Sequence, residues 1–152
     1  MRVHKIFRQQ SIHAPAKEVW DFFSDPGNLS LLTPPYMKMR VTSGQLPTEI
    51  YPGQIITYRL SPVLGLPVNW VTEITHVIPG KLFVDEQRKG PYKIWHHEHH
   101  FEQVGDKCIM TDIVHYALAY GLLGKIAHSL FVKRQLGNIF DYRLRQVKNI
   151  FK

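Results

Sequence analysis

Apolar and polar residues follow a helical period along the C-terminal part of the chain. Between Gly121 and Lys152, apolar side chains recur at spacings of three and four, and basic side chains fill much of what remains. The apolar members are Ile126, Leu130, Phe131, Leu136, Ile139, Phe140, Val147, Ile150 and Phe151, and the basic ones are Lys125, Lys133, Arg134, Arg143, Arg145 and Lys148. The pattern predicts one long amphipathic helix, loosened in its middle by Gly137 and Asn138. Because no other segment is typical of a long helix, its apolar stripe is expected to pack on a sheet.

The middle of the chain has a two-residue period, which is typical of strands. Six strands are predicted over residues 38–43, 54–60, 68–77, 81–87, 93–104 and 107–119, with a loop over 61–67. A first strand over 3–12 precedes them and is followed by two short helices, around Val19 to Phe23 and Leu29 to Leu32. Short connections favour antiparallel neighbours. The predicted fold class is α+β: a helix-grip fold in one domain, 1–152, with a seven-stranded antiparallel curved sheet around the long C-terminal helix.

Composition and charge narrow the functional classes. No apolar run reaches the roughly 18 residues of a membrane span, the N-terminus lacks the apolar core of a signal peptide, and the single cysteine, Cys108, has no disulfide partner within the chain. We therefore expect a cytoplasmic protein. The net charge of +7 suggests anionic partners, such as an acidic ligand or a phospholipid surface, but the scattered basic residues are also typical of a solvated helix face. No basic–aromatic motif predicts nucleic-acid binding.

An ordered set of short motifs resembles a known superfamily. The motifs are Ala14-Pro15, Val19-Trp20, Phe22-Phe23, Asn28-Leu29, Thr33-Pro34-Pro35, Val68-x-Trp70, Glu73-Ile74, Phe83 to Gln87, Gly90-Pro91-Tyr92, Trp95-x-His97-x-His99-x-Phe101, Asp112-x-Val114-x-Tyr116, Gly121, Gly124 and Tyr142-Arg143. They resemble the START/birch-allergen-like (SRPBCC) superfamily, and within it a ligand-binding subfamily labelled cell-division-inhibitor-like or polyketide-cyclase-like. The resemblance implies a deep cavity between sheet and helix that holds a small, mostly apolar ligand. It implies no cofactor and no settled reaction.

The richest chemistry lies in the predicted hairpin over 93–119. Strand alternation places Trp95, His97, His99 and Phe101 on one face. A two-residue turn at Gly105-Asp106 sets the pairing of the strands. That register pairs Phe101 with Met110, His99 with Asp112, His97 with Val114, and Trp95 with Tyr116. We assign this aromatic face to the interior.

Three interpretations of the polar residues on this face remain open. Asp112 can accept a hydrogen bond from His99 in a purely structural network. Alternatively, the imidazoles and the carboxylate orient the polar end of a ligand. Finally, His97, His99 and Asp112 offer the donors of a metal site, but such a site needs a good third ligand and supporting contacts. The sequence-based prediction is that the protein needs no metal and no cofactor.

Other candidates are weaker. Tyr58, Trp70 and Phe83 are interpreted as cavity walls. The charged run of Asp85, Glu86 and Arg88 is interpreted either as a charge group at the cavity rim or as ordinary solvated charge. Cys108 begins a strand beside a turn and has no basic neighbours that favour a nucleophile.

These observations favour a carrier of a small hydrophobic or aromatic ligand, with an acidic ligand compatible with the charge. Its ligand-binding residues are predicted to be Trp70, Trp95, His97, His99, Phe101, Asp112, Tyr116, Leu136 and Phe140. One alternative is an enzyme of the polyketide cyclase or aromatase type with His97, His99 and Asp112 as acid–base groups. Another is a lipid-transfer module that uses the basic helix at a membrane surface, although the sequence favours this less.

Overall fold

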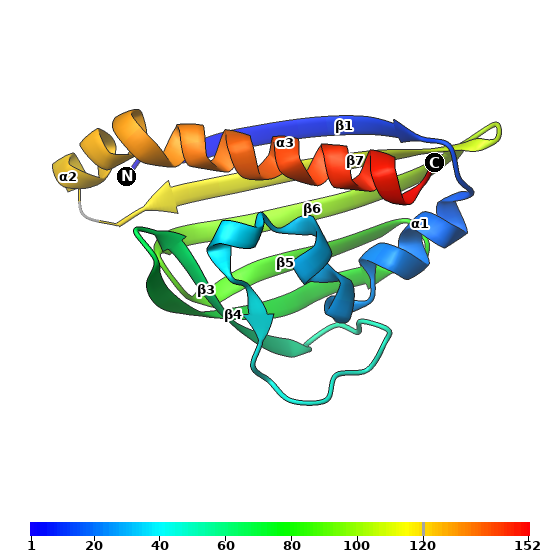
Figure 1. Ribbon diagram of the computed structural model, residues 1–152, viewed down its shortest axis with the longest axis horizontal. Coiled ribbons are helices and arrows are strands. Elements are labelled where there is room, and N and C mark those ends of the chain that lie inside the picture. The colour runs from blue at the N-terminus through cyan, green and yellow to red at the C-terminus, as the bar shows by residue number, and fades with distance from the viewer. Residues whose placement is uncertain (120) are drawn as a thin grey trace.

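A seven-stranded antiparallel sheet curves around the C-terminal helix in the computed structural model, which describes residues 1–119 and 121–152 (Figure 1). The strands are β1 (His4–Ile12), β2 (Arg40–Val41), β3 (Ile55–Val63), β4 (Leu66–Ile78), β5 (Leu82–Lys89), β6 (Tyr92–Val104) and β7 (Lys107–Leu118), in the spatial order β1-β7-β6-β5-β4-β3-β2. The helices are α1 (Ala16–Phe23), the 3₁₀ turns η1 (Pro26–Leu32) and η2 (Pro35–Met37), α2 (Gly121–Ala127), the π-helical turn η3 (His128–Val132) and α3 (Lys133–Ile150). The predicted helix-grip fold is confirmed.

The short helices after β1 close one end of the sheet, near the C-terminal end of α3 (Figure 1). Pro15 precedes the first turn of α1, where its missing N–H costs no hydrogen bond. The buried Trp20 of α1 packs edge-on against Phe83 and Phe101, at ring distances of 5.8 and 5.3 Å. Asp25 begins η1 by accepting a hydrogen bond from the Gly27 N–H at 2.9 Å. These contacts anchor the N-terminal helices to the sheet interior.

The long hairpins determine which side chains face the interior. The predicted register of β6 with β7 is confirmed, including His99 opposite Asp112 and His97 opposite Val114. The strands β4 and β5 pair with two register shifts, near Thr72 and near His76, which are β-bulges that bend the sheet. Two predictions for neighbouring segments were wrong. The expected loop over 61–67 is largely strand, since β3 and β4 meet at a tight turn around Gly65, and the expected strand over 38–43 shrinks to β2.

The predicted long C-terminal helix runs without a break over residues 121–150, but its hydrogen bonding changes from α-helical to π-helical at η3, whereas Gly137 and Asn138 lie within the regular helix α3. Ahead of α3, the apolar side chains of Leu122, Leu123, Ile126, Leu130 and Phe131 are exposed, so the apolar stripe that contacts the sheet begins later than predicted. The side chain of Lys125 lies outside the described residues. No helix among the described residues is both long and apolar enough to cross a membrane.

The interior consists of two apolar clusters. The larger contains Trp20, Phe83, Phe101 and Val147, and the smaller is formed by Val114, Tyr116, Leu136 and Phe140. The polar side chains His97, His99, Asp112 and Arg143 are also buried. Buried polar groups need hydrogen-bond partners, so these four side chains are expected to contact one another within the core.

Candidate functional site

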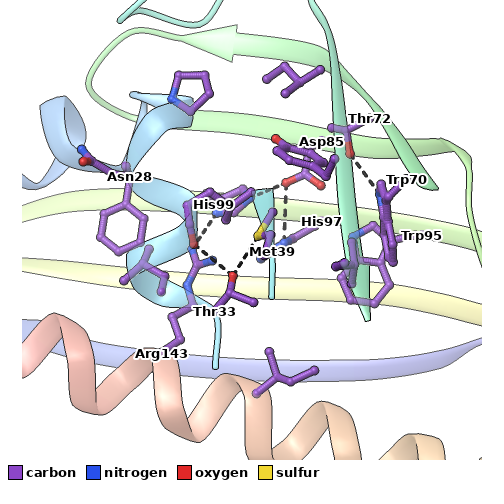
Figure 2. Close-up of a pocket in the computed structure, with 18 of the residues that line it drawn as sticks. Asn28, Thr33, Met39, Trp70, Thr72, Asp85, Trp95, His97, His99 and Arg143 are labelled. Carbon is purple, nitrogen blue, oxygen red and sulfur yellow. Dashed lines mark hydrogen bonds and ion pairs between the residues drawn. The ribbon is translucent and has the colours of Figure 1, made fainter. Parts of the chain in front are cut away.

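A cavity of about 210 Å³ lies between the sheet and α3 (Figure 2). Its walls are mainly apolar and come from the short N-terminal helices, from β3 to β6 and from α3. They include Phe22, Phe23, Leu32, Met37, Met39, Ile50, Ile56, Tyr58, Leu60, Trp70, Ile74, Phe83, Tyr92, Trp95, Leu136, Ile139 and Phe140. A water molecule needs only about 10–15 Å³ on a comparable measure, so the space can hold a small organic molecule.

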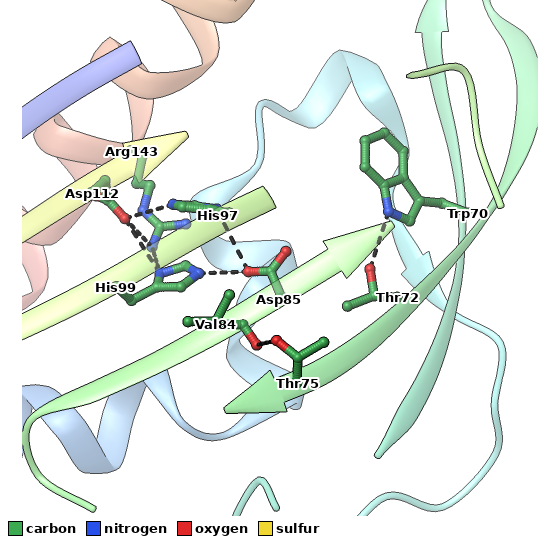
Figure 3. Close-up of polar contacts among 9 residues, drawn as sticks. All are labelled: Trp70, Thr72, Thr75, Val84, Asp85, His97, His99, Asp112 and Arg143. Carbon is green, nitrogen blue, oxygen red and sulfur yellow. Dashed lines mark hydrogen bonds and ion pairs between the residues drawn. The ribbon is translucent and has the colours of Figure 1, made fainter. Parts of the chain in front are cut away.

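Charged and polar side chains meet at one part of the wall (Figure 3). Asp85 comes from β5, His97 and His99 from β6, Asp112 from β7 and Arg143 from α3. The sheet register brings the first four together, because Asp85 pairs with His97 and Asp112 with His99. Arg143 completes the group from the opposite layer, one helical turn after Phe140 and one before Val147.

The five side chains form one connected network. Nε2 of His97 lies 2.9 Å from Oδ1 of Asp112, and Nε2 of His99 lies 2.6 Å from Oδ2 of Asp85. Arg143 donates from Nη2 to Oδ1 of Asp112 at 3.3 Å and to Nδ1 of His99 at 3.2 Å. Nδ1 of His97 faces Oδ2 of Asp85 at 3.6 Å, too far for a hydrogen bond. Asp112 thus lies on the side of both imidazoles that is away from the cavity, and Asp85 lies on the side that faces the cavity.

The charge of Asp112 is held by its neighbours. Burial would raise the pKa of this carboxyl, but Arg143 and the hydrogen bond from His97 outweigh burial and keep its pKa well below the usual range. The ionised carboxylate can only accept hydrogen bonds, so His97 donates to it from Nε2–H. The expected contact of His99 with Asp112 is longer, 3.3 Å from Nδ1, and the nearer imidazole partner is His97. The predicted His99–Asp112 pair is corrected accordingly.

The pKa values of Asp85 and His97 are also shifted by burial and by neighbouring groups. Burial raises the pKa of Asp85, but nearby His97 and the hydrogen bond from His99 bring it below the usual value. Burial lowers the pKa of His97, and the adjacent His99 lowers it further, against the opposing effect of the two carboxylates. Asp85 is therefore ionised and His97 neutral near pH 7.

Aromatic rings hold the imidazoles in position. The ring of His99 stacks on Phe83, with centroids 4.0 Å apart, and lies 3.7 Å from the ring of His97, tilted by 31°. The guanidinium of Arg143 lies over the Phe23 ring, with Cζ 4.9 Å from its centroid. Burial raises the pKa of Tyr58, another wall residue, so this phenol stays protonated. The polar network is therefore rigidly packed within an otherwise apolar wall.

Comparison with known proteins identifies the family. A family model described as polyketide cyclase / dehydrase and lipid transport matches residues 12–139, which is most of the chain. The chain belongs to this family. No curated protein sequence matches it.

Several solved structures are similar to this chain in their fold. The ZhuI aromatase/cyclase from Streptomyces sp. R1128 is 15% identical with a TM-score of 0.76, over 98% of this chain and 93% of that one. A START superfamily protein from Mycobacterium smegmatis is 11% identical with a TM-score of 0.70, over 97% of each chain. The major latex-like protein 151 from Panax ginseng is 13% identical with a TM-score of 0.70, over 98% of this chain and 97% of that one. Together with the family model, this likeness in fold confirms the predicted superfamily.

Six of the nine residues predicted to bind ligand line the cavity. They are Trp70, Trp95, His97, His99, Leu136 and Phe140. The remaining three, Phe101, Asp112 and Tyr116, are buried but are not among the lining residues. Phe101 packs under Trp20 in the larger apolar cluster, Tyr116 belongs to the smaller cluster, and Asp112 lies behind the imidazoles. The ligand contacts themselves stay a prediction.

Sequence reasoning missed two residues of the site. Asp85 was assigned to a solvated rim, but it lies in the cavity wall, whereas Glu86 and Arg88 pair with each other on the outer side. Alternation from Phe83 would have indicated the inward direction of Asp85. Arg143 was placed on the polar helix face, although its spacing from Phe140 puts it on the apolar stripe. In each case a charged residue occupies a position that periodicity assigns to the core.

Proposed function

We propose that the chain binds a small, mostly hydrophobic ligand whose polar end meets Asp85, His97 and His99. The observation that carries this proposal is the contrast within one cavity between long apolar walls and a single polar group. Ligand pockets commonly combine an apolar lining with a few fixed polar groups that set orientation. The cavity of about 210 Å³ is smaller than the roughly 300–1,000 Å³ of many such pockets, which favours a compact molecule.

The charges at the polar group favour a neutral ligand end. Asp112 and Arg143 compensate each other at 3.3 Å, and Asp85 leaves one negative charge beside two imidazoles. An anionic group would be repelled there, so the acidic partner suggested by the net charge of +7 is not favoured at this site. A hydroxyl or carbonyl group fits better, because the site offers acceptor and donor atoms side by side.

Tryptophan substitution tests the proposal. Leu136→Trp, on the cavity wall, should lower the affinity for a fluorescent apolar probe at least about tenfold, because the indole occupies the ligand space. The matched control is Leu122→Trp on α2, where the leucine is 72% exposed and the probe affinity should not change. Circular dichroism verifies that each variant is folded. Equal probe affinity for the wild type and Leu136→Trp would contradict binding in this cavity.

A catalytic role is the second candidate, favoured by the presence of His97 and His99 on the cavity wall. In that case Asp112 acts only by orienting His97, because it lies behind the imidazole, and Asp85 is the carboxylate beside the ligand. Native mass spectrometry of protein purified from its own host distinguishes the two functions. A carrier retains and releases one unchanged molecule, whereas an enzyme converts that molecule on incubation.

A further inference from the structure

Three side chains on the cavity wall offer metal-binding atoms close together. The ligand atoms of Asp85, His97 and His99 all lie within 4.8 Å of one another. The sequence-based prediction of no metal considered Asp112 as the third ligand, and Asp112 lies on the other side of the imidazoles. The structure supplies Asp85 instead, and we propose that Asp85, His97 and His99 form a binding site for one divalent transition-metal ion, with Zn²⁺ as the probe.

The spacing of the donor atoms fits such an ion. Oδ2 of Asp85 lies 2.6 Å from Nε2 of His99 and 3.6 Å from Nδ1 of His97. Ligands bound to zinc at about 2.0–2.1 Å lie roughly 3.0–3.4 Å apart, depending on whether the angle between them is octahedral or tetrahedral. The two observed distances bracket this range. The carboxylate oxygen therefore lies close to ligand spacing from both imidazole nitrogens, and all three atoms lie within 4.8 Å of one another.

The hydrogen bond from His97 to Asp112 leaves the other ring nitrogen of His97 facing Asp85. His97 donates from Nε2–H to Asp112, so Nδ1 of the neutral ring carries a lone pair. This lone pair faces Oδ2 of Asp85, which also only accepts, across a gap of 3.6 Å. A cation in that gap contacts the carboxylate oxygen and the imidazole nitrogen together. The observation that most strongly indicates a metal ion is the grouping of three donor atoms, from two histidines and one carboxylate, within 4.8 Å of one another on the cavity wall.

His99 can bind the same ion after its proton changes nitrogen. In the metal-free network Arg143 donates to Nδ1 of His99, so Nε2–H donates to Asp85. When an ion replaces that N–H, the proton resides on Nδ1 and is donated to Oδ1 of Asp112, 3.3 Å away, and Arg143 then donates to Asp112 alone. No proton has to leave the site. Both imidazoles then donate to one buried carboxylate while ligating the ion, an arrangement that commonly supports metal-bound histidines.

The three protein ligands leave other coordination positions of the ion open. The three ligand residues line the cavity, so the remaining positions around the ion face the ligand space. Two histidines, one carboxylate and open positions make a set suited to ions such as Zn²⁺ or Fe²⁺. The inference does not rest on the proposed hydrophobic ligand, because the metal alone is used to test it.

Zinc titration of protein stripped with a chelator tests the site. Isothermal calorimetry should give one tight equivalent for the wild type, weakened at least about tenfold in Asp85→Asn, which keeps the shape but removes the charge. Asp112→Asn should weaken binding about 10–100-fold through the imidazoles it orients. The matched control removes the outer histidines of the same strand: His96→Gln with His100→Gln should keep the tight equivalent.

Several results would overturn the proposal. They are a wild type without a tight equivalent, an equivalent that Asp85→Asn retains in full, or one that disappears in the His96→Gln/His100→Gln control. Visible absorption of bound Co²⁺ gives an independent readout, since its spectrum should change in His99→Gln and stay the same in the control. If Asp85→Asn fails to fold by circular dichroism, His99→Gln and the control still decide the outcome.

Discussion

The two faces of strand β6 carry the same residue type in different surroundings. On the inner face, His97 and His99 are about 5% exposed and contact Asp85, Asp112 and, in the case of His99, Arg143. On the outer face, the side chains of His96 and His100 are 33% and 40% exposed. His96 contacts Glu86 at 2.7 Å and His100 contacts Glu98 at 2.8 Å. Both faces thus have short imidazole–carboxylate contacts, and they differ in access to water.

This difference shows that the length of a polar contact alone does not determine how much the pair contributes to stability. Water competes for the outer pairs and screens them, so each contributes about 0–1 kcal/mol. On the inner face the side chains are shielded from bulk water, and removing one member leaves a buried charge without compensation. The inner group is therefore expected to dominate stability and ligand chemistry, and the outer group to behave as surface charge.

The largest effect is expected from Asp112→Leu. The substitution leaves Arg143 buried with no carboxylate at 3.3 Å and takes away the acceptor of His97. The free energy of unfolding should fall by about 3–5 kcal/mol, as measured by urea denaturation.

A second substitution shows whether the loss comes from the stranded cation. Asp112→Leu combined with Arg143→Met removes both charges, so the double variant should be more stable than the sum of the single effects predicts, by about 1–3 kcal/mol. Strict additivity would mean that the two residues are not coupled, and would contradict the network described here.

Much of this inner face was predictable from the sequence because strand alternation and a two-residue turn are local properties. The turn at Gly105, with φ of 61°, fixes the register of β6 with β7, and this register placed His99 opposite Asp112. The long amphipathic pattern likewise predicted a helix that packs on the sheet. Local rules were sufficient wherever one hairpin brought the residues together.

The rest of the site depends on contacts between distant segments. Asp85 reaches the histidines through the β5–β6 pairing, and Arg143 through the packing of α3 on the sheet. In a sequence, a charged residue is assigned to the surface by default, since buried charges are rare. Its burial here is possible because the partners come from other elements. The π-helical turn at η3 and the exposed Leu130 are similar cases, because periodicity reveals neither a change of helix type nor where a helix leaves the sheet.

A moderate effect is expected from Phe83→Leu. Phe83 is 5% exposed and stacks on His99 at 4.0 Å with an angle of 15° between the rings. Losing the stacked ring should lower the free energy of unfolding by about 1–2 kcal/mol in urea. The matched control is Phe7→Leu on β1, where the phenylalanine is 51% exposed and the change should stay within about 0.5 kcal/mol. A Phe83 variant as stable as its control would show that the ring does not support the imidazole.

Protonation of His97 should have a smaller effect that depends on pH. Burial and the neighbouring His99 lower the pKa of His97 in the folded protein below that of an unfolded chain, about 6.5. The unfolded state therefore binds more protons below this pH, and stability should fall as the pH decreases from about 6.5 toward the folded-state pKa. In His97→Phe this part of the pH dependence is absent. Urea titrations in a chelator at several pH values measure it, and a constant stability difference between wild type and variant would contradict it.

The smallest effect is expected on the outer face, from Glu98→Gln. Glu98 accepts from His100 at 2.8 Å and lies 3.5 Å from His96, and the hydrogen bond from His100 lowers the pKa of Glu98. A lowered carboxyl pKa adds stability at neutral pH that disappears as the pH falls through the folded-state pKa. Because the pair is reached by water, the loss in Glu98→Gln should stay within about 0.5 kcal/mol and shrink further at about 1 M salt. Asp112→Asn makes the same chemical change on the buried side and should cost clearly more, about 1–3 kcal/mol, with little dependence on salt. Equal losses for the two amide variants in urea denaturation would mean that burial is not what separates the two faces of β6.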